Sequence, residues 1–227
     1  ASSENICFFD EEVHKKKEFE NFIESNMQQA LDSQCFEMVL QPKIDLQTNS
    51  VIAAEALVRW RLEDGTYLPP SSFVDIFEKN LFCSKLDFYM LKKAIQQIRK
   101  WIDMGMNPVN ISVNQSKIVF YHENYISELK SLLEEYNVSG SYITLEVLES
   151  TVIEDIDMFN SILTEVKKLG FSVSLDDFGS GYSSLNVLSK LQIDELKIDR
   201  IFLHTKSEVD NQRTKWILES IIDIAKK

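Results

Sequence analysis

Short segments in which apolar and polar residues alternate recur along this chain, and a period of two is typical of β-strands. The pattern predicts strands over residues 36–44, 51–59, 109–114, 142–147, 171–176 and 194–198. Apolar residues at helical spacing predict helices over residues 11–33, 72–79, 84–103, 116–135, 155–169 and 207–226. Turn residues join the first two strands as a hairpin, and helices and strands alternate after it. This order indicates a parallel sheet or a barrel with its helices outside.

Each predicted strand has one apolar face and one face that carries polar groups. In residues 110–114, Ser112 and Asn114 lie on one face, and Ile111 and Val113 lie on the other. An open sheet covered by helices on both sides would need two apolar faces. A barrel fits better, because the active sites of barrels lie where the strands end. The oxygen-bearing residues at these ends are Glu55, Asn114, Glu146, Asp176 and Asp177.

These strand-end residues offer carboxylate and amide oxygens and no thiolate or imidazole. Such hard donors suit Mg²⁺ or Mn²⁺ rather than zinc. Carboxylates that share one pocket repel each other unless cations neutralise them. Two interpretations stay open. Lys197 and Arg59 form a structural ion-pair network with the acids, or two divalent ions bind there and activate water for attack on phosphorus.

The overall charge narrows the classes of partner. The 227 residues carry a formal net charge of −12, which disfavours nucleic-acid polymers and anionic membranes as partners. No apolar run approaches the roughly 20 residues of a membrane span, and no signal peptide is visible. Cys7, Cys35 and Cys83 lack CxxC spacing and are interpreted as reduced thiols. We therefore expect a cytoplasmic protein without membrane contact in this segment.

Six motifs, taken in order along the chain, resemble one known family. Glu55-Ala56-Leu57-Val58-Arg59-Trp60 resembles the signature of the EAL-domain family, which comprises bacterial cyclic-di-GMP phosphodiesterases. The same resemblance extends through residues 41–45, 112–116, 145–150, 176–185 and 196–200. It covers the chain from about residue 22 to the end.

The resemblance implies a modified (β/α)₈ TIM-type barrel whose first strand runs antiparallel. It implies hydrolysis of cyclic di-GMP to linear pGpG with two Mg²⁺ or Mn²⁺ ions. Glu55, Asn114, Glu146 and Asp176 match the ligands of one ion, Asp176 bridges to a second ion held by Asp177, and Lys197 matches the lysine that positions or deprotonates water. Glu55, Asp176 and Lys197 thus form the expected catalytic set.

Further positions match the substrate contacts and the regulatory loop of the family. Gln41, Leu57 and Arg59 fall where the family contacts the dinucleotide, and Glu149 matches the glutamate that anchors the loop after Asp177. That loop is linked in the family to dimerisation, so the resemblance implies a homodimer.

The resemblance also sets the expected domain boundaries. Residues 1–21 are expected to be a connector, in which residues 5–9 resemble the tail of a GGDEF domain, and GGDEF or sensory domains are expected partners in the native chain. Residues 22–227 are expected to be an EAL domain that is incomplete at its C-terminus. The family continues into two more strands that supply a further metal-binding glutamate.

One departure from the family pattern and two rival hypotheses remain open. Leu148 stands where the family usually has threonine, close enough to the predicted site to tilt the loop. A rival hypothesis keeps the fold but makes the domain a catalytically inactive cyclic-di-GMP receptor or regulatory module. A third, another Mg²⁺-dependent barrel enzyme, agrees with the strand ends but not with the series of motifs.

Overall fold

A computed structural model describes residues 11–149, 156–179, 188, 190–203 and 208–225. The expected strand and GGDEF-like tail at residues 5–9, Cys7 and the loop over residues 180–185 lie outside these residues. Within them, Cys35 and Cys83 are free thiols.

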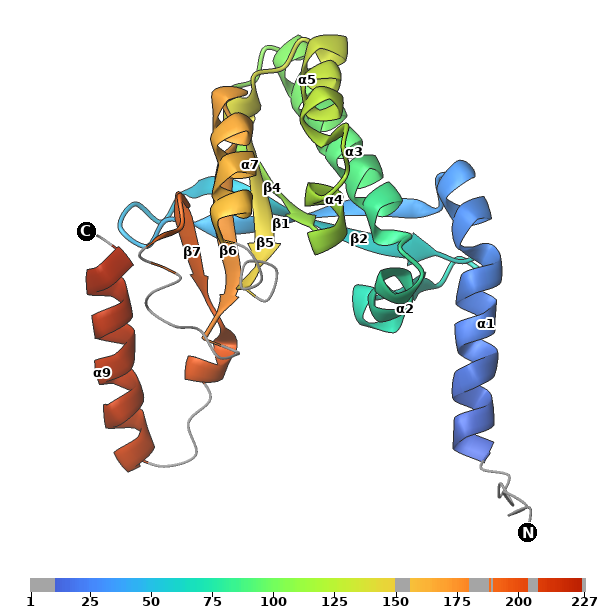
Figure 1. Ribbon diagram of the computed structural model, residues 1–227, viewed down its shortest axis with the longest axis horizontal. Helices are drawn as coiled ribbons and strands as arrows, with labels where there is room; N and C mark the ends of the chain where they lie inside the picture. Colours follow the sequence, from blue (N-terminus) through green and yellow to red (C-terminus); the bar gives the residue numbers. More distant parts are fainter. Residues whose placement is uncertain (1–10, 150–155, 180–187, 189, 204–207, 226–227) are drawn as a thin grey trace.

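One sheet forms the centre of the fold, with strands in the order β1-β2-β4-β5-β6-β7 (Figure 1). β1 and β2 pair antiparallel, and each later neighbour on this path pairs in parallel. The expected antiparallel first strand is therefore confirmed, as is the α/β fold. The strands are β1 (Phe36–Ile44), β2 (Val51–Arg61), β3 (Tyr67–Leu68), β4 (Asn110–Gln115), β5 (Ile143–Leu148), β6 (Ser172–Phe178) and β7 (Glu195–Ile198).

Helices follow the strands, and Figure 1 shows α3, α5 and α7 together on one side of the sheet. The α-helices are α1 (Glu11–Asp32), α2 (Val74–Lys79), α3 (Cys83–Asp103), α4 (Lys117–Phe120), α5 (Tyr125–Tyr136), α7 (Ile156–Lys168) and α9 (Glu208–Ala225). Short 3₁₀ turns cover Pro70–Ser72, Gly140–Tyr142 and Arg200–Leu203.

The prediction of one helix over residues 116–135 is wrong. The chain leaves helical geometry after Phe120, and the Tyr121 N–H donates to the carbonyl of Ile118 in a tightened last turn. Phe120 and Tyr125 are both buried, and their rings pack edge to face with centroids 5.2 Å apart. Because a straight helix would hold these two side chains five residues apart on different faces, the break lets both reach the core.

The apolar faces of the central strands are buried as the alternation predicts. Ile111 and Val113 of β4 and Val173 and Leu175 of β6 are at most 1% exposed. Burying each such side chain contributes roughly 1.5–3 kcal/mol. The opposite strand faces are thereby fixed in orientation, and they carry the polar residues of the candidate site.

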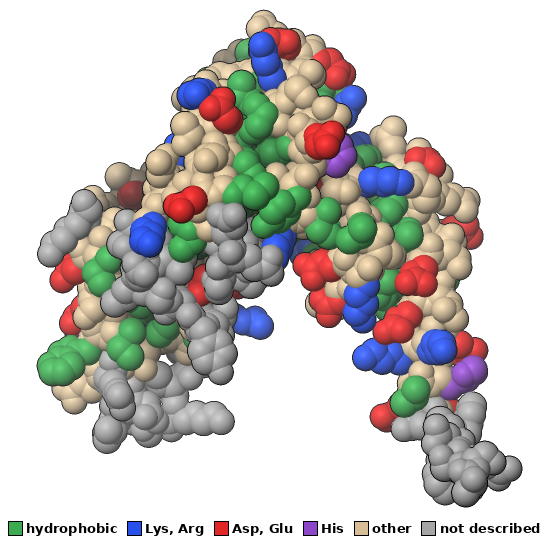
Figure 2. Space-filling model, in the orientation of Figure 1, with side chains coloured by type: hydrophobic (Ala, Val, Ile, Leu, Met, Phe, Trp, Pro, Cys, Tyr) green, Lys and Arg blue, Asp and Glu red, His purple; other side chains and the backbone are tan. Residues whose placement is uncertain are grey.

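Among the described residues, most large apolar side chains of the last helix, α9, are exposed to solvent. Ile221 is its buried residue, whereas Trp216 is 74% exposed. Figure 2 shows further apolar side chains on the surface of α9. None of the helices in the described part of the chain has the length and apolar character needed to cross a membrane.

Candidate functional site

Three carboxylates from separate strands of the sheet meet at one point: Glu55 lies in the middle of its strand, and the other two lie toward the carboxyl ends of theirs. Glu55 of β2, Glu146 of β5 and Asp176 of β6 each present an oxygen, and these oxygens lie within 4.8 Å of one another. Asn114 pairs in register with Glu146, and its Nδ2 lies 3.4 Å from Oε1 of Glu55. The expected first-ion ligands Glu55, Asn114, Glu146 and Asp176 are therefore brought together.

Lys197 of β7 contacts all three carboxylates. Its Nζ donates to Oε2 of Glu55 at 3.0 Å, to Oε2 of Glu146 at 2.7 Å and to Oδ2 of Asp176 at 2.8 Å. Burial alone lowers the pKa of Lys197, but the hydrogen bonds that it donates to Asp176 and Glu146 outweigh burial and raise that pKa. In this arrangement the lysine is an ammonium that offsets the repulsion among the acids.

Asp177 turns the chain at the end of β6. It has a φ of 53°, in the left-handed region that few residues other than glycine adopt, and its N–H donates to Oδ1 of Asp176 at 2.8 Å. Burial and the nearby charges of Asp176 and Asp199 raise the pKa of its carboxyl group. Among the described residues, Asp177 is not one of the three carboxylates within 4.8 Å, so its role toward a second ion stays a prediction.

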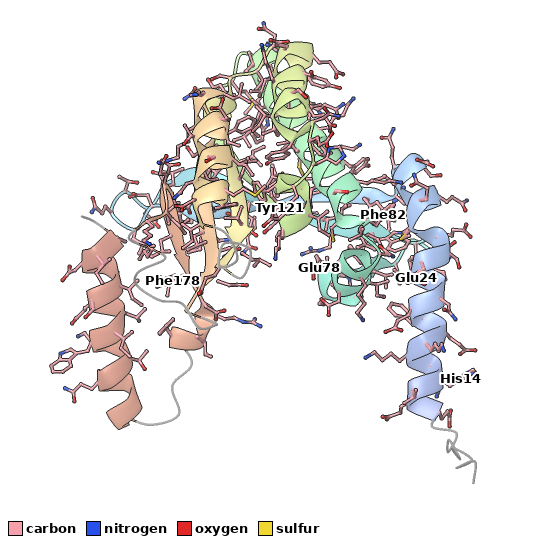
Figure 3. The ribbon with its side chains drawn as sticks, viewed as in Figure 1. His14, Glu24, Glu78, Phe82, Tyr121 and Phe178 are labelled. Carbon is pink, nitrogen blue, oxygen red and sulfur yellow. The ribbon has the colours of Figure 1, made fainter. Side chains whose placement is uncertain are left out.

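Glu149 contacts the segment that follows these two aspartates. Its buried Oε2 accepts a hydrogen bond from the Gly179 N–H at 3.0 Å. Gly179 has a φ of 91°, and a Cβ there would lie 2.4 Å from the ring of Phe202. Phe178 stands at the end of β6, where Figure 3 labels it. The bond joins Glu149 to the segment after Asp177, and the role of Glu149 as a loop anchor stays a prediction.

The expected substrate-contacting residues lie along β1 and β2. Gln41 pairs with Glu55 across the two strands. Leu57 and Asn114 line a cavity of about 380 Å³ whose lining does not include Glu55, Glu146 or Asp176. The Arg59 guanidinium donates to the Val58 carbonyl at 2.8 Å. Contacts of these side chains with a dinucleotide remain predictions.

Leu148 and Asp87 also line this cavity. Leu148 lines it, is 38% exposed and pairs in register with Asp176, so the threonine-to-leucine departure changes a cavity wall. Asp87 of α3 also lines it, and Oδ2 of Asp87 accepts from Ser116 N at 2.8 Å and from Ser116 Oγ at 2.5 Å. Burial raises the pKa of Asp87 and the two bonds from Ser116 lower it. Burial has the larger effect, and the pKa is about 7.

Lys43 is a site residue that sequence reasoning missed. Its Nζ donates to Oε1 of Glu146 at 2.9 Å, to Ser112 Oγ at 2.7 Å and to Oε1 of Glu195 at 3.0 Å. Alternation along β1 places Lys43 on the same face as Gln41, and that signal could have found it. Asp87, by contrast, lies on a helix with no motif that indicated a contact with β4.

The donor set fits a hard divalent cation. Three carboxylates and an amide are the ligands that Mg²⁺ and Mn²⁺ take, whereas zinc sites favour imidazole and thiolate. Glu146 has no exposed side-chain surface, and Asp176 has 17%. Carboxylates buried this far require positive charge close by, which Lys43 and Lys197 supply here and which a divalent ion would also supply. Glu55, Asn114, Glu146 and Asp176 could therefore hold such an ion.

Comparison with known protein families and curated proteins agrees with this geometry. Residues 24–227 match the model of the EAL domain. The "Bifunctional diguanylate cyclase/cyclic di-GMP phosphodiesterase MucR" of Pseudomonas aeruginosa is 33% identical over 87% of this chain, and the match covers 29% of that protein. The "Cyclic di-GMP phosphodiesterase PdeR" of Escherichia coli is 32% identical over 87% of this chain and 30% of its own length. The chain thus spans less than a third of these relatives.

Solved structures share the fold over nearly the whole chain. The c-di-GMP complex of the PaMucR phosphodiesterase superposes with a TM-score of 0.81 at 31% identity, covering 90% of this chain and 82% of that one. The EAL enzyme Bd1971, in its cAMP- and cyclic-di-GMP-bound form, gives a TM-score of 0.80 at 26% identity, covering 95% and 57%. Together with the strand-end acids and the match over residues 24–227, these likenesses place the chain in a family: it belongs to the EAL domain family.

Proposed function

We propose that this chain is a metal-dependent phosphodiesterase that hydrolyses one phosphodiester bond of cyclic di-GMP to give linear pGpG. The observation that carries the proposal is the convergence of Glu55, Glu146 and Asp176, from three strands of one sheet, within 4.8 Å. The printed names of MucR and PdeR, and the nucleotide in the PaMucR structure, support the choice of substrate.

Mg²⁺ or Mn²⁺ is the proposed cofactor, with two ions per site. Glu55, Asn114, Glu146 and Asp176 would hold the first ion, and Asp176 and Asp177 would hold the second. Such ions supply Lewis-acid activation of water and of a phosphoryl oxygen. Asp176 is the residue common to both, so the proposal depends most on it.

Lys197 and the residues along β1 and β2 act on water and substrate. As an ammonium, Lys197 donates hydrogen bonds, which suits it to orient a water molecule and to offset charge on phosphate rather than to remove a proton. Gln41, Leu57 and Arg59 would bind the dinucleotide, and the cavity beside Leu57 offers an apolar wall for a base.

Assembly and regulation are also part of the proposal. Glu149, through its bond to the Gly179 N–H, would transmit changes in the following loop to the aspartates. A homodimer formed near that loop, and GGDEF or sensory domains in the native chain, remain predicted partners.

Product analysis tests the activity. The chain is incubated with cyclic di-GMP and Mn²⁺ or Mg²⁺, and linear pGpG is quantified by chromatography and mass spectrometry. We expect product with metal, none in EDTA, and at least a thousandfold loss of turnover in Asp176→Asn. An Asp103→Asn variant, which changes an exposed acid on α3, is the matched control. Absence of pGpG together with tight nucleotide binding in EDTA by calorimetry would instead establish a receptor.

A further inference from the structure

Lys43 links three strands beneath the carboxylate cluster. It projects from β1 and bonds Ser112 of β4, Glu146 of β5 and Glu195 of β7, with all three donor-acceptor distances at or below 3.0 Å. Its side chain is 22% exposed, so these are partly shielded contacts rather than a flexible surface pair. A lysine ammonium has three protons, and each has an acceptor here.

The carboxylate of Glu146 is divided between two lysines. Oε1 accepts from Lys43 at 2.9 Å, and Oε2 accepts from Lys197 at 2.7 Å. Oε2 therefore faces the point at which Glu55 and Asp176 also converge, because Lys197 contacts all three acids there. Rotation of the planar carboxylate would have to break both bonds, and the Glu146 side chain has no exposed surface from which water could replace them.

We propose that Lys43 is a positioning residue for the divalent-cation site: by holding Oε1 of Glu146 it keeps Oε2 directed at the position that Glu55 and Asp176 share. This inference rests on the proposed function, since it concerns the same site. Glu195 and Ser112 accept the other hydrogen bonds of Lys43 and so hold it in place. The orientation of Glu146 therefore depends on β1 and β7, the first and last strands in the order of the sheet. Groups that fix metal-ligating side chains typically change metal affinity 10–100-fold when removed.

Charge and geometry predict opposite effects when Lys43 is replaced. If Lys43 acted only through its charge, its loss would leave the site more negative, and a divalent cation would bind more tightly. If Lys43 orients Glu146, its loss lets the carboxylate turn, and the cation binds more weakly. The sign of the change in affinity therefore separates the two.

The experiment is a titration of Mn²⁺ alone into the 227-residue chain. Binding is measured by calorimetry and by the loss of the electron paramagnetic resonance signal of free Mn²⁺. We expect Lys43→Met to weaken binding about 10–100-fold. Lys43→Arg, which keeps both the charge and the donors, should restore affinity to within about threefold of the wild type. Lys92→Met is the control, because it removes a lysine of α3 whose partner is Glu135.

The outcomes separate the proposed function from the positioning role of Lys43. Wild-type chain that binds no Mn²⁺ overturns the proposed function and this inference with it. Wild-type binding together with unchanged or tighter binding in a folded Lys43→Met chain overturns the positioning role alone. If circular dichroism shows that Lys43→Met does not fold, Lys43→Leu takes its place, because it also removes both the charge and the donors. Weaker binding in Lys43→Leu supports the positioning role, and unchanged or tighter binding overturns it.

Discussion

Replacing Asp87 with asparagine should change how the stability of the protein depends on pH. Asp87 is partly buried on α3, its Oδ2 accepts two hydrogen bonds from Ser116, and burial raises its pKa from 3.8 to about 7. Between about pH 4 and pH 7 the folded protein holds a proton at Asp87 that the unfolded chain has released. The free energy of unfolding therefore falls as pH rises through this window. Above about pH 7 it stays lower by a constant amount.

The magnitude follows from the two pKa values. One pH unit between them is worth about 1.4 kcal/mol, so the span from 3.8 to about 7 corresponds to ~4 kcal/mol. Asparagine keeps an acceptor for Ser116 and never ionises. Asp87→Asn should therefore match the wild type near pH 4 and exceed its free energy of unfolding by several kcal/mol at pH 8.

Urea unfolding monitored by tryptophan fluorescence, at half-unit steps from pH 4 to pH 8, measures the difference in free energy of unfolding between the wild type and Asp87→Asn. Subtracting the two curves cancels the carboxylates that both proteins share. Asp103→Asn on the same helix controls for the loss of one negative charge. Wild-type and Asp87→Asn curves that run parallel across the whole range would show that Asp87 does not keep its proton when folded, and the reasoning would be refuted.

Three further substitutions test other contacts. Lys197→Met should lower kcat about 100-fold or more without weakening Mn²⁺ binding, since it removes a donor and a competing positive charge; calorimetry showing much weaker binding would contradict this. Glu149→Ala leaves the Gly179 N–H without its acceptor and should lower the free energy of unfolding by about 1–3 kcal/mol in urea titrations, an effect absent if the bond is not formed. Gly140→Ala would place a Cβ 2.4 Å from the Leu169 carbonyl oxygen and should therefore lower the melting temperature. A melting temperature equal to that of the wild type would argue against this close approach.

Local sequence patterns were sufficient to predict most of the sheet. The alternation around Ser112 and Asn114 predicted β4 within about a residue, because one face packs on helices and the other does not. The break between α4 and α5 could not be predicted in the same way. It depends on Phe120 and Tyr125 both reaching the core, which is a tertiary requirement rather than a helical propensity.

The candidate site shows the same division. Motifs indicated Glu55, Glu146 and Asp176, and the structure brings these three carboxylates together. Alternation along β1 places Lys43 on the face of Gln41, but its partners on β4, β5 and β7 follow from the register of the assembled sheet rather than from any local pattern. Asp87 was missed for a related reason, since a bond between a helix and a strand end leaves no periodic signal.

The lysine contacts of Glu146 have a consequence for how the chain folds. The Lys43–Glu195 pair joins residues 152 positions apart, and Lys197 reaches Glu55 across 142 positions. Contacts of such long range form slowly, because the intervening chain must first be ordered. During synthesis the acids of β2 and β5 emerge after Lys43 of β1 but before Lys197 of β7, so the bonds of Lys197 to Glu55 and Glu146 form only when β7 docks. The contacts of Lys197 with the acidic cluster are therefore a late event of folding, whereas the proposed metal ligands on β2, β4, β5 and β6 can come together before β7 docks.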